Sequence, residues 1–202
     1  DGGQDDNDCE DAGAVYVFAV DIQTSKWTQQ AYLKSPNSEI DDWFGWSVSM
    51  SDNLLAVGAA GENDRVGSVY LFSLDPQTST WNYITSVSAS NPNSEDWFGN
   101  SVSLSGDLLA VGARTEKSCA SWINPPEGQR DNECGGAGAT YVFLNDPQNS
   151  EWSQIAYIKA PNPDIRDNVG RSVSLLDDSL VVGATGEKSC ADGINPSEGQ
   201  RD

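Results

Sequence analysis

The chain has 202 residues, of which 31 are acidic and 11 basic, and its formal charge is −20. Such a negative chain disfavours the phosphate backbone of nucleic acids and anionic membrane surfaces as partners. No apolar run is long enough to span a bilayer, and the lack of histidine excludes Ser-His-Asp and Cys-His nucleophilic systems.

Three copies of one unit make up nearly the whole chain. Each starts with an apolar run, at GAVYVF, GSVYLF and GATYVF, and continues through a segment that contains one tryptophan. The unit closes with DWFGWSVSMSDNLLAVGA (42–59), DWFGNSVSLSGDLLAVGA (96–113) and DNVGRSVSLLDDSLVVGA (167–184). The second interval between copies is longer than the first, and the inserted segment carries two cysteines. This recurrence predicts a tandem-repeat architecture.

Each unit contains four short segments in which apolar and polar residues alternate. In the second copy they are 68–74, 81–88, 98–104 and 108–113. Alternation with β-branched and aromatic residues predicts strands, and Asp75-Pro76 and Ser105-Gly106-Asp107 supply turns between them. The sequence therefore predicts an all-β protein of four-stranded antiparallel meanders, arranged as part of a β-propeller or as an open array. A stacked solenoid or a string of separate small sheets is the alternative.

The repeats divide the chain into five segments. We expect three repeat units, an inter-unit loop and the first half of a further loop. Their bounds are 1–63, 64–118 and 135–189 for the units, 119–134 for the loop and 190–202 for the half loop.

Cys119 and Cys134 flank a short segment rich in proline, glycine and asparagine. Because such a segment is neither helical nor a central strand, a loop-closing disulfide is expected, which would stabilise the fold by about 3 kcal/mol. A disulfide indicates an oxidising compartment and hence secretion. Two reduced thiols are the alternative.

The cysteine loops also suggest a cation site. Asp6 and Asp131 occupy one repeated position, Asn132 follows the second of them, and Glu127 lies just upstream. An oxygen-rich loop closed by a disulfide could coordinate calcium. The alternative is that these side chains make Asx-turn hydrogen bonds in a solvated loop.

The repeated string resembles the FG-GAP repeat, which builds the seven-bladed propeller of integrin alpha subunits and occurs in many secreted microbial proteins. Phe44-Gly45 and Phe98-Gly99 carry the FG, and Gly170 follows a valine at that position. The Val-Gly-Ala strings around Gly58, Gly112 and Gly183 stand where the family has GAP, without its proline. The family's calcium loop is shortened here to SMSDN, SLSGD or SLLDD. The resemblance implies a propeller-type fold and an adhesive or secreted role.

Two of these motif features have a direct physical interpretation. Gly45, Gly99 and Gly170 adjoin bulky residues at strand starts, so we expect positive φ or a close approach of backbone there. Trp43-Phe44 and Trp97-Phe98 are expected to pack between neighbouring sheets, with ligand stacking as the alternative.

The sequence predicts a non-catalytic extracellular repeat protein. The first hypothesis is a structural subunit that assembles with copies of itself, and the second is an adhesion propeller that binds a protein or a glycan. An accessory domain of a secreted enzyme is a third. Cys190 aligns with Cys119 and Cys9 with Cys134, so the ends carry two halves of one cysteine loop. We therefore expect Cys190 to pair with Cys9 of a neighbouring copy, or both to pair within a longer array or a larger closed propeller.

Overall fold

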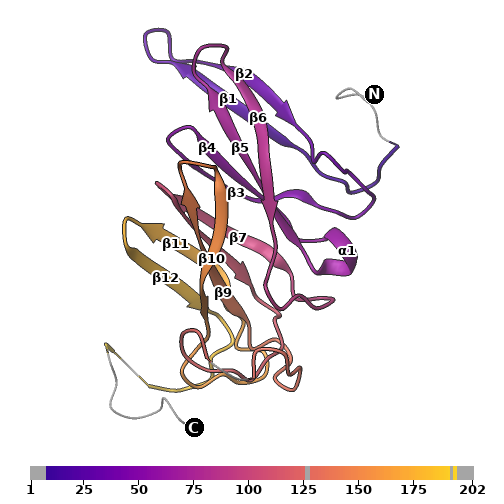
Figure 1. Cartoon of the computed structure of the whole chain (residues 1–202), viewed down its shortest axis with the longest axis vertical. Coiled ribbons are helices and arrows are strands. Elements are labelled where there is room, and N and C mark those ends of the chain that lie inside the picture. The colour runs from indigo at the N-terminus through magenta and orange to yellow at the C-terminus, as the bar shows by residue number, and fades with distance from the viewer. Residues whose placement is uncertain (1–7, 126–127, 192, 195–202) are drawn as a thin grey trace.

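The computed structural model describes residues 8–125, 128–191 and 193–194, and nearly all of the regular secondary structure in them is β-strand (Figure 1). The strands are β1 (Val15–Asp21), β2 (Lys26–Leu33), β3 (Phe44–Ser51), β4 (Leu54–Ala59), β5 (Ser68–Asp75), β6 (Thr80–Val87), β7 (Phe98–Ser105), β8 (Leu108–Ala113), β9 (Ala139–Asp146), β10 (Glu151–Ile158), β11 (Val169–Leu176) and β12 (Ser179–Ala184). One short helix, α1 (Glu62–Arg65), joins β4 to β5. The predicted all-β class is confirmed.

Antiparallel pairing arranges the strands in two complete and two half sheets. The first sheet has the order β3-β4-β5-β6 and the second β7-β8-β9-β10. The pairs β1-β2 and β11-β12 form two-stranded sheets, here called the N-terminal and the C-terminal half-sheet. Compared with the complete sheets, β1-β2 correspond to the third and fourth strands, and β11-β12 to the first and second.

This arrangement corrects the grouping of strands that the repeats suggested. The four strands expected within 68–113 are present, but they belong to two different sheets. The first sheet runs across the expected boundary at 63/64, because β4 pairs with β5 in the register Val57↔Tyr70. The sheets are thus two strands out of phase with the repeat units, because each FG strand starts a new sheet instead of completing the previous one.

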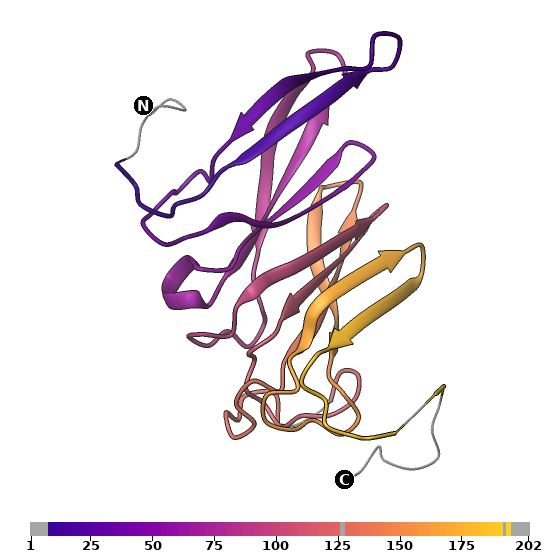
Figure 2. The same cartoon turned by 180° about the vertical axis from the view of Figure 1, so that it is seen from behind.

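The sheets stack face to face, with the two half-sheets at opposite ends of the stack (Figures 1 and 2). Alternate residues of β5 serve both faces. Tyr70 and Phe72 pack towards the N-terminal half-sheet with Val15, whereas Val69 and Leu71 pack towards the second sheet. Burial on both faces explains why these strands are so apolar.

Neighbouring sheets are joined by backbone hydrogen bonds that recur in each repeat. The amide of Phe44 donates to the carbonyl of Ala12 at 3.0 Å, and the amide of Phe98 donates to that of Val66 at 3.1 Å. The same bond recurs at Val169, whose amide donates to Ala137 at 3.0 Å. The chain therefore repeats one sheet-to-sheet junction three times with nearly constant geometry.

Candidate functional site

The FG position, which is Val169-Gly170 in the third copy, lies at each of the three junctions between sheets. Phe44 and Phe98 are buried, and Gly45, Gly99 and Gly170 have φ of +95°, +84° and +80°. The expected positive φ at these glycines is therefore present, and it is a conformation that side-chain-bearing residues rarely adopt.

The glycines of the Val-Gly-Ala strings face the FG glycines of the next sheet. A Cβ on Gly58 would lie 2.1 Å from the carbonyl oxygen of Gly99, and one on Gly112 would lie 2.0 Å from that of Gly170. A Cβ on Gly183 would meet only Ser172 within the described chain, at 2.5 Å from its hydroxyl oxygen. The face of β12 at Gly183 is therefore open where β4 and β8 are covered by a following sheet.

Tryptophans from neighbouring sheets also meet at the junction between the first and the second sheet. Trp43, which precedes β3, lies 5.2 Å from Trp97, which precedes β7, measured between ring centroids. The guanidinium of Arg114 lies 4.1 Å from the centroid of the Trp97 ring, and that of Arg65 also lies over both tryptophans. Packing between sheets thus accounts for these aromatic residues.

The half-sheets expose residues whose counterparts are buried in the complete sheets. Tyr16 and Phe18 of β1 are 49% and 54% exposed, whereas their counterparts in β9, Tyr141 and Phe143, are 0% and 3% exposed. Val181 of β12 is 68% exposed, and its counterpart in β8 is fully buried. Among the described residues, β1 pairs only with β2 and β12 only with β11. Each half-sheet therefore presents an unpaired edge and an uncovered apolar face.

A buried polar cluster lies at the end of the second sheet beneath the cysteine loop. The Lys159 ammonium donates to Glu116 Oε2 at 2.6 Å and to the carbonyl of Ser118 at 2.8 Å. Tyr141 donates to Asn91 Oδ1 at 2.7 Å, and Asn91 Nδ2 donates to Glu116 Oε1 at 3.1 Å. Asn91 lies between β6 and β7 and Lys159 directly follows β10, so the partners of the Glu116 carboxylate come from two different connecting segments. The members of the cluster are Asn91, Glu116, Ser118, Tyr141, Tyr157 and Lys159.

Burial determines the electrostatics of this cluster. It lowers the pKa of Lys159 and raises the pKa of Tyr141 well above its usual value, and the negative charge of Glu116 raises the latter further. Burial also raises the pKa of nearby Asp96 to about 7. Since the ammonium and the carboxylate are both almost completely buried, each depends on the other to compensate for its lost hydration.

The first sheet contains a simpler version of the cluster. Tyr70 donates to Glu62 Oε2 at 2.7 Å and contacts Asn37, but Ser88 stands where the second sheet has Lys159. The first sheet also has no cysteine loop. Of the two complete sheets, the second therefore has both a buried lysine and a cysteine loop, and the first has neither.

The expected disulfide between Cys119 and Cys134 is present, with a Cα–Cα distance of 5.0 Å. Cys9 and Cys190 are exposed free thiols. The carboxylate of Asp131 accepts the amide of Cys119 at 2.8 Å, which ties the loop to its own disulfide.

The calcium hypothesis remains a prediction. Asp6 and Glu127 lie outside the described residues, and Asn132 is exposed beside Asp131. Within the ranges that the structure describes, no three carboxylate or thiol side chains gather in a way that could hold a metal ion. The hydrogen bond from Cys119 to Asp131 spans twelve residues, so it links two parts of the loop and is not the local Asx-turn bond of the alternative interpretation.

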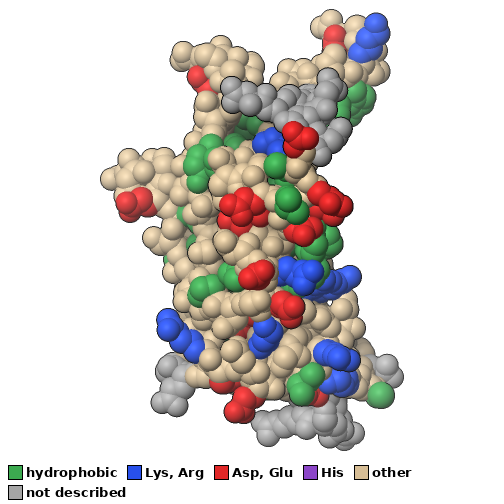
Figure 3. Space-filling view, turned by 90° about the vertical axis from the view of Figure 1, so that its right-hand side faces the viewer, with side chains coloured by type: hydrophobic (Ala, Val, Ile, Leu, Met, Phe, Trp, Pro, Cys, Tyr) green, Lys and Arg blue, Asp and Glu red, His purple; other side chains and the backbone are tan. Residues whose placement is uncertain are grey.

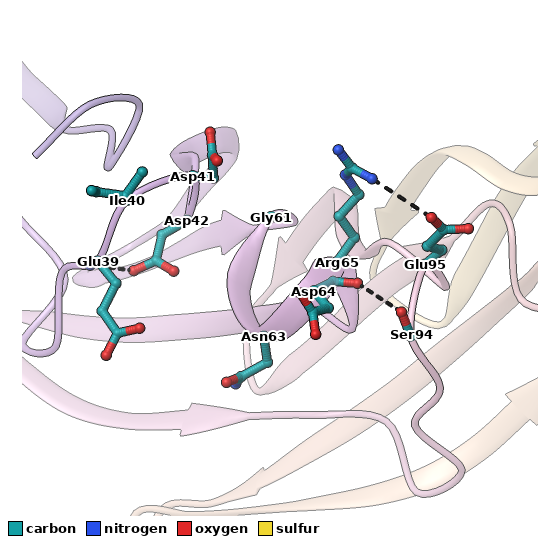
Figure 4. Close-up of a pocket in the computed structure, with 10 residues that line it drawn as sticks. All are labelled: Glu39, Ile40, Asp41, Asp42, Gly61, Asn63, Asp64, Arg65, Ser94 and Glu95. Atoms are coloured by element: carbon teal, nitrogen blue, oxygen red, sulfur yellow. Dashed lines mark hydrogen bonds and ion pairs between the residues drawn. The ribbon is translucent and has the colours of Figure 1, made fainter.

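A polar pocket of about 450 Å³ lies beside α1, between the segments before β3 and before β7 (Figure 4). Arg65 is the basic residue of the lining and lies 3.6 Å from Glu95. The acidic residues of the pocket lining are Glu39, Asp41, Asp42, Asp64 and Glu95.

Acidic and basic side chains are both present on the face of the molecule shown in Figure 3, with most of the basic ones in its lower part.

The stacked four-stranded antiparallel sheets define a blade-type repeat protein, the class that includes the β-propellers. A family model described as the FG-GAP repeat matches residues 27–72 and 81–143, more than half of the chain. The chain belongs to the FG-GAP repeat family, whose repeats are typically extracellular and generally non-catalytic. Comparison with curated proteins finds no match. In the part of the chain that the structure describes, no helix is long and apolar enough to cross a bilayer.

Proposed function

We propose that this chain is a non-catalytic, extracellular structural protein whose copies join head to tail into an array of stacked sheets. The observation that carries the proposal is the pair of half-sheets, which expose apolar residues at positions buried in the complete sheets. Together they contain all four strands of one sheet, with β11-β12 as its first half and β1-β2 as its second. Unpaired strand edges with apolar faces are surfaces that association covers.

Because the joined surfaces differ, the contact is heterologous and generates rings or filaments. The described residues of each copy contain twelve strands, which are enough for three four-stranded sheets. A two-copy ring would have six sheets, within the range of known propellers. We favour an open filament, since a junction that is repeated from copy to copy has no inherent stop.

Light scattering coupled to size exclusion tests the proposal. The chain should give masses that rise with concentration in multiples of 21.6 kDa, and electron micrographs should show filaments. Val181→Asp should abolish association, because it places a charge on the open face of β12. Ile22→Asp is the matched control, since Ile22 is even more exposed but lies in the turn between β1 and β2. The mass of a single chain at every concentration would refute the proposal.

A second function, recognition of an extracellular protein or glycan, is favoured by the acidic pocket of Figure 4. Its carboxylates would take a basic peptide or the hydroxyl groups of a sugar. If this function is the correct one, the monomeric chain should bind such a ligand, and Asp41→Asn/Asp64→Asn should weaken the binding.

A further inference from the structure

We infer that the junction between copies reproduces the second sheet in detail, with Glu187 of one copy and Lys34 of the next as its buried ion pair and Cys190–Cys9 as its disulfide. This inference rests on the proposed head-to-tail assembly and names the residues that select the partner. It follows from two alignments within the chain. Positions 108–119 match 179–190, and positions 134–159 match 9–34.

The strand register follows from the pairing of β8 with β9. In that pair, Val111 lies opposite Tyr141 and Leu109 opposite Phe143. The same register would place Val182 of one copy opposite Tyr16 of the next, and Leu180 opposite Phe18.

The joined half-sheets would also cover the outer face of the second sheet. Ile155 of β10 is 48% exposed there. Its counterpart Ile84 of β6 is partly buried, because the first sheet is followed by another sheet against which Ile84 packs. A following sheet made from two copies would bury Ile155 in the same way.

Each half-sheet carries one half of a polar cluster like that of the second sheet. Glu187 follows the C-terminal half-sheet, and Lys34 follows the N-terminal half-sheet. Glu187 accepts the amide of Ser189 at 3.1 Å and its hydroxyl at 2.9 Å, as Glu116 accepts hydrogen bonds from Ser118. Glu187 is exposed, however, whereas Glu116 is fully buried against Lys159.

At the N-terminal half-sheet, the Lys34 ammonium donates to the backbone carbonyl of Gly13 at 2.6 Å. The corresponding ammonium of Lys159 donates to the carboxylate of Glu116. The rings of Tyr16 and Tyr32 lie 5.2 Å apart between centroids, and their counterparts in the second sheet lie 5.1 Å apart. Joining the halves would bring Glu187 onto Lys34 in the geometry of the buried pair of the second sheet.

The cysteines fit the same alignment. Cys190 follows Glu187 at the spacing that separates Cys119 from Glu116, and Cys9 corresponds to Cys134. With glutathione disulfide as oxidant, the two thiols would form one S–S bond, and their two protons and two electrons would convert the oxidant into two molecules of glutathione. The first sheet has neither the lysine nor the cysteines. The two half-sheets, when joined, therefore reproduce the second sheet and not the first.

Charge reversal tests the inference in the full chain under reducing conditions, which keep Cys9 and Cys190 as thiols. Lys34→Glu should weaken association at least about 30-fold, because it opposes two carboxylates in a buried junction. Glu187→Lys should do the same. Lys188→Glu is the matched control, since Lys188 pairs with exposed Asp164 and should leave association unchanged.

The decisive sample is an equal mixture of the two charge-reversed chains. Each variant alone opposes like charges at every junction. When the two variants alternate, however, the unchanged Glu187 of one meets the unchanged Lys34 of the other, and the two introduced side chains also meet with opposite charges. The mixture should therefore associate as the natural chain does.

The outcomes separate this inference from the assembly on which it rests. If the natural chain associates and Lys34→Glu associates equally well, this inference is wrong while head-to-tail assembly stands. If the natural chain never associates, the assembly itself is wrong.

Discussion

Replacing Lys159 by methionine is expected to lower the free energy of unfolding by about 3–5 kcal/mol, because it leaves a buried carboxylate without its counterion. Glu116 is fully buried, and the Lys159 ammonium lies 2.6 Å from its Oε2. The measurement is chemical denaturation of Lys159→Met in a Cys9→Ser/Cys190→Ser background, which removes both free thiols and so prevents disulfides between copies.

Two variants show whether the lost charge pair is the cause. Adding Glu116→Gln to Lys159→Met should recover most of the stability, since the amide needs no counterion. Lys34→Met, the equivalent change in the N-terminal half-sheet, should cost only about 1 kcal/mol when the chain is measured as a single copy, because Lys34 then bonds a backbone carbonyl. Equal losses for Lys159→Met and Lys34→Met would contradict the account of the polar cluster.

Gly112→Ala is expected to destabilise the chain by about 1–3 kcal/mol or more through overpacking. The new Cβ would lie 2.0 Å from the backbone carbonyl oxygen of Gly170, and neither sheet can yield without breaking the junction. Thermal unfolding under reducing conditions measures the loss.

Gly183→Ala is the matched change on the open face of β12. Its Cβ meets only the side-chain oxygen of Ser172 at close range within the described chain, and that side chain can rotate, so the melting temperature of the monomer should change little. Association should nevertheless be lost, because Gly183 corresponds to Gly112 and would lie against Gly45 of the next copy. A Gly183→Ala chain that associates normally would show that the following sheet does not pack there.

Much of the fold could be predicted from the sequence, because the repeats and the two-residue alternation specify the strands directly. The phase of the sheets could not. Sheets that match the repeat units and sheets shifted by two strands contain the same strands in the same order along the chain. They are distinguished by the pairings that cross the expected boundaries, Val57 with Tyr70 and Val111 with Tyr141. The alternation within a strand indicates which of its faces is buried. It does not indicate which other strand pairs with its edge.

The candidate site was only partly predictable. The cysteine pair was found from the loop that it flanks, and the glycines were found from their neighbours. The buried ion pair was missed, because Glu116 and Lys159 are far apart in the sequence and look like ordinary surface residues. A usable signal was present, since Glu-Lys-Ser-Cys occurs twice, at 116–119 and 187–190, and lysine precedes the Ser-Pro-Asn or Ala-Pro-Asn string only in the first and third copies.

The most direct test of head-to-tail assembly is a disulfide map of mixed chains. Equal amounts of ¹⁴N- and ¹⁵N-labelled chain are combined while reduced, oxidised with glutathione disulfide, and digested without reduction. Head-to-tail assembly predicts cross-linked peptides that join Cys190 to Cys9, including hybrids of one light and one heavy partner. Free thiols at both positions, or linked peptides in which both partners always carry the same label, would contradict it.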